Sequence, residues 1–229
     1  MWEIPFVSHE NKVRGLLICF IGIDGSGKTT LAKRFLSIMD SKGVKAKYVW
    51  GAYDVVVLRP FILRHQKIPL REKGSSGQRG ESGNLEMLLR TNAFRSVYKT
   101  LVFLEYSVEI FFKITLGLIL GENIVCDRYI YDTVINLTVN LGYRMKDFKI
   151  SLRSFLRIGR RPDLTFFVDV PEETAYRRKK DIPSIDYLRK RRKLYSALAV
   201  ELNAVRLSGL DNFHMQDYQM REALERFLN

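Results

Sequence analysis

The chain has 229 residues, 46% of them hydrophobic, so it is long enough to bury a full core, and this composition excludes a chain that is disordered throughout. Its formal net charge of +13 predicts contact with anionic groups; phosphate ligands, nucleic acid or an acidic membrane surface would each satisfy it. The two cysteines, Cys19 and Cys126, lie in apolar runs, which favours buried thiols in a reducing, cytoplasmic compartment over a disulfide framework.

Apolar runs and helical patterns alternate along the chain. Strands are predicted at residues 16–22, 44–50, 123–126, 165–170 and 204–207. Helices are predicted at 29–41, at 85–120 as two helices or one bent helix, at 172–202 with a break near Pro183, and at 220–228. Strands separated by helices need crossover connections, so we expect an α/β fold with a parallel sheet and no domain boundary within residues 1–229.

The run from Leu101 to Leu120 is long and apolar enough to raise the question of a membrane span. Glu105, Glu109 and Lys113 are spaced four residues apart within it, which puts three charges on one helical stripe. Because charges at the middle of a bilayer are costly, we interpret the run as an amphipathic core or interface helix.

The first strand runs directly into Gly22-Ile-Asp-Gly-Ser-Gly27-Lys28-Thr29, which matches the phosphate-binding pattern G-x-x-x-x-G-K-[ST] without a gap. The glycines allow backbone N–H groups to curl around phosphate oxygens, and the N-terminus of the following helix adds positive potential. Lys28 is expected to reach the β- and γ-phosphates of a nucleotide, and the Thr29 hydroxyl to ligate Mg²⁺. The residues that we expect to bind the nucleotide are Gly22, Gly25, Ser26, Gly27, Lys28, Thr29 and Thr30.

A second polar group, Asp127-Arg128-Tyr129, follows the buried strand at 123–126. The carboxyl ends of parallel strands are where α/β proteins bind ligands. Asp127 is therefore a candidate Mg²⁺ ligand, directly or through water, and Arg128 can grip a phosphate with two parallel hydrogen bonds. A surface salt bridge is the alternative for these residues, and the phosphate loop upstream favours the ligand site.

With these motifs in place, the chain resembles the thymidylate kinase-like family of P-loop nucleoside monophosphate kinases. Four segments carry the resemblance in family order: FIGIDGSGKTTLAKRF, DRY at 127–129, RPDLTFFVDVPEETAYRR at 161–178, and a basic segment that runs to Tyr195. The resemblance implies a P-loop NTPase three-layer fold, with a five-stranded parallel sheet, helices on both faces and a helical lid at residues 172–195 of a single domain. It also implies transfer of the γ-phosphate of ATP, with Mg²⁺, to a nucleoside monophosphate, for which dTMP is the family default.

The resemblance assigns acceptor-binding roles to individual residues. Asp24 matches the family's acidic residue that contacts the sugar of the acceptor nucleotide. Arg128, followed by Tyr129, matches the arginine that binds the acceptor phosphate. Arg95 matches the family's substrate arginine on the helix after the second strand.

The resemblance also bears on the lid and on assembly. Ser26 stands where one family subclass has a P-loop arginine, which implies that the lid supplies the catalytic arginine, and an arginine closing over the transferred group can raise the rate by ~10³–10⁵. The expected catalytic set is Lys28, Asp127, Arg128, Arg177 and Arg178. Residues 207–213 lie where the family packs the adenine of ATP. The family commonly dimerises through helices, and residues 101–120 offer an apolar face for a homodimer, although burial within the monomer explains that run equally well.

Two departures from the family concern the acceptor. The second strand is followed by the long apolar and basic segment VWGAYDVVVLRPFILRHQKIPLREK in place of the family's short turn. After DRY, the sequence IYDTVINL puts Asn136 and Leu137 where the family has the Tyr and Gln that lie near the base. The residues that handle phosphate are thus reproduced and those that read the base are not, which leaves the base of the acceptor open.

The positive charge is concentrated in two windows, which motivate two further hypotheses. Residues 177–193 hold nine Lys/Arg and two Asp, and residues 59–79 hold six Lys/Arg and one Glu. The apolar and basic mixture at 59–79 is consistent with a kinase of a non-nucleotide acceptor, a lipid or sugar phosphate, at a membrane surface. A non-enzymatic P-loop module that binds nucleic acid is a weaker hypothesis, because no RNA-binding signature is present and Asp127-Arg128 would have no use.

Overall fold

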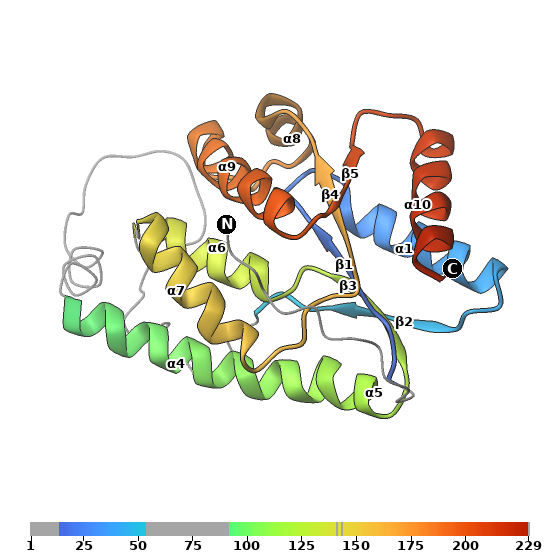
Figure 1. Cartoon of the computed structure of the whole chain (residues 1–229). Helices are drawn as coiled ribbons and strands as arrows, with labels where there is room; N and C mark the ends of the chain where they lie inside the picture. Colours follow the sequence, from blue (N-terminus) through green and yellow to red (C-terminus); the bar gives the residue numbers. More distant parts are fainter. Residues whose placement is uncertain (1–13, 54–91, 141, 143, 229) are drawn as a thin grey trace.

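The computed structural model describes residues 14–53, 92–140, 142 and 144–228 (Figure 1). Five strands form one parallel sheet: β1 (Leu17–Ile21), β2 (Ala46–Trp50), β3 (Asn123–Asp127), β4 (Leu164–Asp169) and β5 (Val205–Ser208). The strand order is β2-β3-β1-β4-β5, so β1 lies at the centre. The expected five-stranded parallel sheet is confirmed, and each strand lies within two residues of its predicted bounds.

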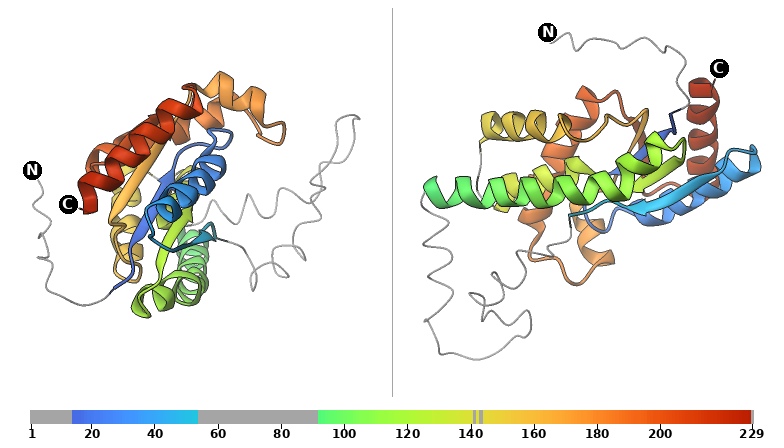
Figure 2. Two further views of the ribbon diagram at one scale, coloured as in Figure 1. Left: turned by 90° about the vertical axis from the view of Figure 1, so that its right-hand side faces the viewer. Right: turned by 90° about the horizontal axis from the view of Figure 1, so that it is seen from below.

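Helices cover both faces of this sheet. They are α1 (Lys28–Ser41), α4 (Asn92–Ile110), the π-helix η1 (Phe111–Thr115), α5 (Leu116–Ile119), α6 (Ile130–Asn140), α7 (Met145–Leu156), α8 (Glu172–Arg178), α9 (Ile185–Glu201) and α10 (Phe213–Leu228). One hydrophobic core lies between one face of the sheet and the helices α1 and α10. The other core lies between the opposite face and the helices α4, η1, α5, α6, α7 and α9 (Figures 1 and 2). The expected three-layer α/β arrangement is thereby confirmed.

The central strand shows why the sheet needs two covering layers. Every residue of β1 is buried, and alternate side chains point to opposite faces, with Cys19 in one core and Phe20 in the other. Phe20 stacks on Phe166 of β4 with ring centroids 4.8 Å apart, and Phe35 of α1 packs edge-on against both rings. Cys126 of β3 is also buried, and both thiols are free.

The continuous helical segment formed by α4, η1 and α5 is amphipathic, with one narrow buried stripe. Its buried face repeats every four residues at Val102, Tyr106, Ile110, Ile114 and Leu118. Glu109 and Lys113 pair at 2.5 Å on the charged stripe that the sequence predicted. None of the helices in the described part of the chain combines the length and the apolar character that a bilayer crossing needs.

Two helical predictions differ from the structure, and a third is confirmed. No helix was predicted over α6 and α7; most of α6 is buried, so it lacks a polar face to produce a helical period. The helix α10 begins at Phe213, well before the predicted residue 220, because the Asn212 side chain accepts a hydrogen bond from the Met215 N–H and caps its first turn. The predicted break near Pro183 separates α8 from α9, and Ser184 caps α9.

Candidate active site

The phosphate loop connects β1 to α1 at the carboxyl end of the central strand. Gly25 and Gly27 have φ angles of 81° and 99°, in the region that favours glycine. A Cβ on Gly25 would lie 2.5 Å from the carbonyl oxygen of Ala175, so α8 packs directly on the loop. Lys28 is 4% exposed, and its Nζ donates hydrogen bonds of 2.7 Å to the carbonyls of Gly22 and Ile23. The ammonium group is thus held inside the loop.

Burial changes the acidity of this lysine. Desolvation, followed by the positive charge of Arg128, lowers the pKa of Lys28 from 10.5 to about 8, although nearby carboxylates oppose the change. A negatively charged ligand in the loop would favour the protonated lysine. The charge on Lys28 is therefore sensitive to pH and to ligand binding in the mildly alkaline range.

Oxygen atoms gather at the start of α1. The Thr29 hydroxyl donates a 2.5 Å hydrogen bond to Oδ2 of Asp127, and the Tyr48 hydroxyl donates to the same oxygen at 3.0 Å. The other carboxylate oxygen of Asp127, Oδ1, is buried and has no hydrogen-bond partner among the described residues, and the same is true of the Ser26 hydroxyl oxygen. A hydroxyl and a carboxylate with a free buried oxygen are the donors that Mg²⁺ prefers, so these residues fit a magnesium ion.

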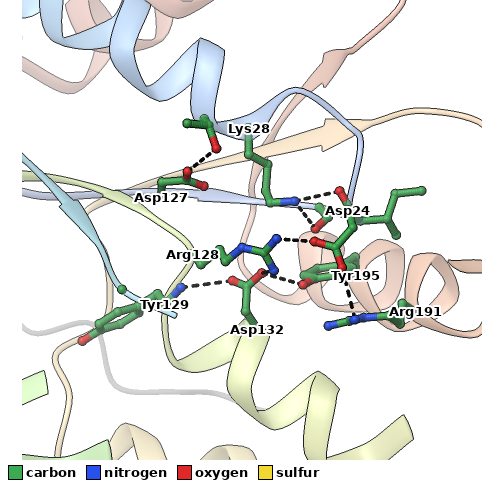
Figure 3. A network of polar contacts seen from close by, with 12 residues as sticks. Asp24, Lys28, Asp127, Arg128, Tyr129, Asp132, Arg191 and Tyr195 are labelled. Atoms are coloured by element: carbon green, nitrogen blue, oxygen red, sulfur yellow. Dashed lines mark hydrogen bonds and ion pairs between the residues drawn. The ribbon is translucent and has the colours of Figure 1, made fainter. Parts of the chain in front are cut away.

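A cluster of ion pairs lies next to the loop (Figure 3). Arg128 donates through one terminal nitrogen to Oδ1 of Asp24, and Nη1 of Arg191 donates to Oδ2 of the same carboxylate at 3.3 Å. The three residues come from the end of β3, from α9 and from the phosphate loop. Arg128 has a φ of 68°, a left-handed conformation that costs a non-glycine residue about 1–2 kcal/mol. Such strain is typical of functional positions.

The charges in this cluster shift one another's acidity. Burial alone would raise the pKa of Asp24, but Arg128, Lys28 and Arg191 outweigh it and hold that pKa well below its usual range. Burial would lower the pKa of the Arg128 guanidinium, but Asp132 and Asp24 raise it above its ordinary value. Asp24 is therefore ionised and Arg128 protonated at neutral pH.

Asp132 extends the cluster into the core. It is 1% exposed, and its two oxygens accept hydrogen bonds from the Tyr129 N–H at 3.0 Å and from the Tyr195 hydroxyl at 2.6 Å. Oδ1 of Asp132 also lies 3.9 Å from Nη1 of Arg128. Burial raises the pKa of Asp132, and the charges of Arg128 and Lys28 oppose this rise. Asp132 thus links α6, α9 and the end of β3.

The structure brings only some of the predicted acceptor residues together. Asp24 and Arg128 are in contact. The Tyr129 side chain is fully buried and points away from them, with its hydroxyl on the Arg160 carbonyl at 2.9 Å (Figure 3). Arg95 lies in the first turn of α4, but its side chain falls outside the described residues, as does the whole segment 59–79.

The predicted lid residues have several different partners. Arg177 is exposed, and Arg178 is exposed with a hydrogen bond of 3.0 Å to the Gly209 carbonyl. Arg192 of α9 is bound to Asp169 at 2.8 Å and to Glu172 at 2.9 Å, which fastens α9 to the end of β4 and to α8. Much of the charge in residues 177–193 is therefore engaged within the protein.

The segment at 207–213 lies against the phosphate loop, as the resemblance implied for an adenine site. A Cβ on Gly209 would lie 2.8 Å from the Ser26 carbonyl oxygen, so the two backbones touch. Beyond it, the Arg34 guanidinium of α1 lies over the Phe213 ring at 4.4 Å. A guanidinium group stacked over an aromatic ring presents planar surfaces on which a base can stack.

Four residues of the site were not assigned roles from the sequence: Tyr48, Asp132, Arg191 and Tyr195. A signal existed for Asp132, because it is a carboxylate within the apolar run IYDTVINL, where a buried charge needs a partner. No local signal marks Arg191, which is one of five adjacent Lys/Arg residues at 189–193. Only the packing of α9 on the sheet distinguishes it.

Comparison with known proteins agrees with the motifs. The chain is 26% identical over 223 residues to "Probable thymidylate kinase" of Archaeoglobus fulgidus, covering 93% of this chain and 97% of that protein. It is 25% identical over 226 residues to "Thymidylate kinase" of Rickettsia typhi, with 94% and 98% covered, and 26% identical over 214 residues to "Thymidylate kinase" of Ligilactobacillus salivarius, with 87% and 90% covered. No protein-family model matches the chain. The resemblance to the thymidylate kinase-like family is confirmed over most of the chain.

Replacing Asp24 by Asn should destabilise the protein, because two mostly buried arginines lose their shared carboxylate. We expect the free energy of unfolding at pH 7 to fall by about 3 kcal/mol, measured by urea denaturation. The folded pKa of Asp24 lies below the unfolded value of 3.8, so the stabilisation is complete above that value and is lost as the pH falls towards the folded pKa. The difference in the free energy of unfolding between wild type and Asp24→Asn should therefore become smaller under strongly acidic conditions.

Asp186→Asn is the matched control for this measurement. It removes the partner of Arg189 in an ion pair whose two side chains are largely exposed. We expect little change, since exposed pairs contribute little. Equal loss of stability in both variants would contradict the structural importance of Asp24.

Proposed function

We propose that this protein is an ATP-dependent phosphotransferase that passes the γ-phosphate of ATP to a nucleoside monophosphate. The observation that carries the proposal is the contact between Asp24 of the phosphate loop and Arg128 at the end of β3. Arg128, which we assign to the acceptor phosphate, thereby lies beside the loop that we assign to the triphosphate, as transfer between two phosphates requires. Relatives named thymidylate kinase support the same activity and make dTMP the first acceptor to test.

On the donor side, each residue has a defined task. Backbone N–H groups of the loop bind the phosphates, and Lys28 leaves the carbonyls of Gly22 and Ile23 to contact the β- and γ-phosphates. Thr29 and Asp127 would hold Mg²⁺, which would supply positive charge to neutralise the phosphates. The adenine packs against residues 207–213.

On the acceptor side, Arg128 binds the acceptor phosphate and Asp24 orients it. A carboxylate has about four acceptor positions, so Asp24 can hold its arginines and still accept a hydrogen bond from a sugar hydroxyl. Asp132 keeps Arg128 in place through its 3.9 Å contact and does not itself touch the substrate. In this arrangement the acceptor oxygen faces the γ-phosphate in the loop.

Residues 172–195 act as the lid of a single domain that spans the chain. Because α8 packs on Gly25, a movement of α8 would change its contact with the phosphate loop. The exposed side chain of Arg177 can swing onto the transferred phosphoryl group when both substrates are bound, and Arg178 can do so once it releases the Gly209 carbonyl. Closure would also exclude water, which limits hydrolysis of ATP.

The acceptor's base is the open part of this proposal. Leu137 is 6% exposed and packs in the core, so it provides neither a polar group nor an open surface for a base. Asn136 is half-buried, and its Oδ1 has no hydrogen-bond partner among the described residues. This site favours an acceptor recognised mainly through its phosphate, which keeps a lipid or sugar phosphate as a second candidate. Nucleic-acid binding has less support, since Arg191 and Arg192 of α9 are already paired with carboxylates within the protein.

An exposed apolar stripe on α4 also supports a homodimer. Its members are Val97, Leu101, Leu104 and Val108 of α4, followed by Phe111 at the start of η1, at alternating spacings of four and three residues. This spacing is that of a helix seam that packs against a second helix. The opposite face of α4 is already buried in the core, so the stripe is available to a second copy.

A panel of nucleoside monophosphates, sugar phosphates and phosphatidic acid vesicles, incubated with radiolabelled ATP and Mg²⁺, tests the activity. We expect at least one nucleoside monophosphate to be labelled by wild type and not by Lys28→Ala. Labelling of a sugar or lipid phosphate alone would replace the nucleotide by the second candidate. If no acceptor is labelled above the Lys28→Ala background, the phosphotransferase proposal fails.

The pKa of Lys28 predicts a pH dependence of ATP binding. Because the protonated lysine binds phosphate and its pKa in the free protein is about 8, the dissociation constant should rise by roughly tenfold for each pH unit above that value. Calorimetric titrations between pH 7 and pH 10 measure it. Lys28→Met should bind ATP weakly with no such dependence, and a wild-type affinity that stays constant over this range would sink the prediction.

The oligomeric state is tested by analytical ultracentrifugation. We expect wild type to sediment as a dimer and Val108→Lys as a monomer, because a charge in the centre of an apolar seam is not solvated in the dimer. Val200→Lys, at an 81% exposed position on α9, is the control and should remain dimeric. A monomeric wild type at micromolar concentration would remove the homodimer from the proposal.

A further inference from the structure

Arg191 differs from the other cations of residues 177–193. Its side chain is 2% exposed, and in the described part of the chain it is the only arginine or lysine of this window that is buried. Its neighbours Lys190 and Lys193 are exposed, and Arg192 is bound to Asp169 and Glu172. Arg191 lies on the buried face of α9, in line with Leu188 and Tyr195, and a charged side chain among these apolar and aromatic neighbours needs a specific partner.

The contacts of Arg191 use one edge of its guanidinium group. Nη1 donates to Asp24 at 3.3 Å and to the Tyr187 hydroxyl, and the guanidinium lies over the Tyr187 ring at 4.8 Å. Nε is buried and has no partner among the described residues, and none of them accepts from Nη2. Nε and Nη2 together form the side edge with which arginine grips a phosphate or carboxylate through two parallel hydrogen bonds. No described residue occupies that edge.

An unused buried donor is costly. A buried N–H without an acceptor destabilises the folded protein by about 1–3 kcal/mol, so such groups are rare unless something binds them. The contacts with Asp24 and Tyr187 hold the guanidinium in a fixed orientation, so little side-chain entropy remains to be lost when an anion binds. Arg191 is thus prepared for a ligand with at least two acceptor oxygens.

The place of Arg191 indicates which ligand this is. Asp24 accepts from Arg128 through Oδ1 and from Arg191 through Oδ2, so both guanidinium groups flank one carboxylate (Figure 3). Among the hydrogen bonds of the described residues, Arg128 also donates through a single nitrogen, Nη2. The carboxylates Asp24 and Asp132 balance the charges of the two arginines. Because the local charges are balanced, the site would select an anion by the direction of the arginine N–H groups and less by its net positive charge.

We propose that Arg191 is a second phosphate-binding residue of the acceptor site, and that it and Arg128, bridged by Asp24, bind the phosphate of the acceptor from two sides. The inference rests on the proposed function, which supplies the phosphate-bearing acceptor. It assigns the acceptor side to a residue of α9, distinct from the exposed Arg177 and Arg178 of α8. It would also give α9 a direct contact with the acceptor through Arg191, which lies one helical turn from Tyr187.

Calorimetric titration of inorganic phosphate tests this, with saturating Mg·ADP present so that the phosphate loop is already filled. We expect wild type to bind one phosphate, and Arg191→Lys and Arg191→Gln to bind it roughly tenfold or more weakly. The lysine variant keeps the charge and loses the two-pronged edge, so its loss would identify the bidentate contact. ADP affinity should change less than threefold, and thermal unfolding of each variant verifies its fold.

Lys193→Gln is the matched control, because Lys193 lies on the same helix and is exposed. It should bind phosphate as wild type does. The proposal is overturned if both Arg191 variants bind phosphate normally, or if Lys193→Gln weakens binding equally, since the effect would then be general electrostatics. A wild type that binds no phosphate beside ADP also overturns it.

The outcomes separate this inference from the proposed function. Phosphate binding that depends on Arg191, together with no labelled acceptor in the kinase assay, would leave the anion site standing and remove the phosphotransferase. If the Arg191→Lys variant labels an acceptor as fast as wild type does, the phosphotransferase proposal stands and Arg191 is removed from the acceptor site.

Discussion

Asp24 accepts hydrogen bonds from two arginines that reach it from different parts of the chain, and the site depends on this shared carboxylate. Arg128 arrives from the end of β3, Arg191 from α9, and Asp24 itself belongs to the phosphate loop. Both arginines are largely buried, so without this carboxylate Arg191 would lose its ion pair and Arg128 would keep, among the described residues, only the 3.9 Å contact with Asp132. The same interaction keeps Arg128 in its left-handed conformation and holds α9 over the end of the sheet.

This constraint separates two functions within one small region. The loop, Lys28 and the Thr29–Asp127 pair form a donor side that many phosphate-binding proteins would share. The arginines on Asp24 form the side that we propose for the acceptor. Of the two residues expected near a base, Leu137 packs in the core and Asn136 alone offers a polar atom. We therefore expect recognition through phosphate and sugar to dominate.

Sequence reasoning was strongest where residues act within one short segment. The phosphate loop, its strand and its helix could be predicted because the pattern and its context are contiguous, and the five strands followed from apolar runs. It was weakest for contacts between distant segments. The direction of the Tyr129 side chain, the Asp132–Tyr195 hydrogen bond and the burial of Arg191 all arise from how α6 and α9 pack, which no local pattern encodes. The helix α6 escaped prediction for the same reason.

The most direct test of the two-sided site is a crystal structure with Mg·ADP and tungstate, a phosphate analogue that is located by its anomalous scattering. We expect ADP in the phosphate loop and a tungstate ion within hydrogen-bonding distance of both Arg128 and Arg191, on the side of the loop where Asp24 lies. Tungstate bound only at other arginines and lysines, with Arg191 still turned only towards Asp24 and Tyr187, would contradict it.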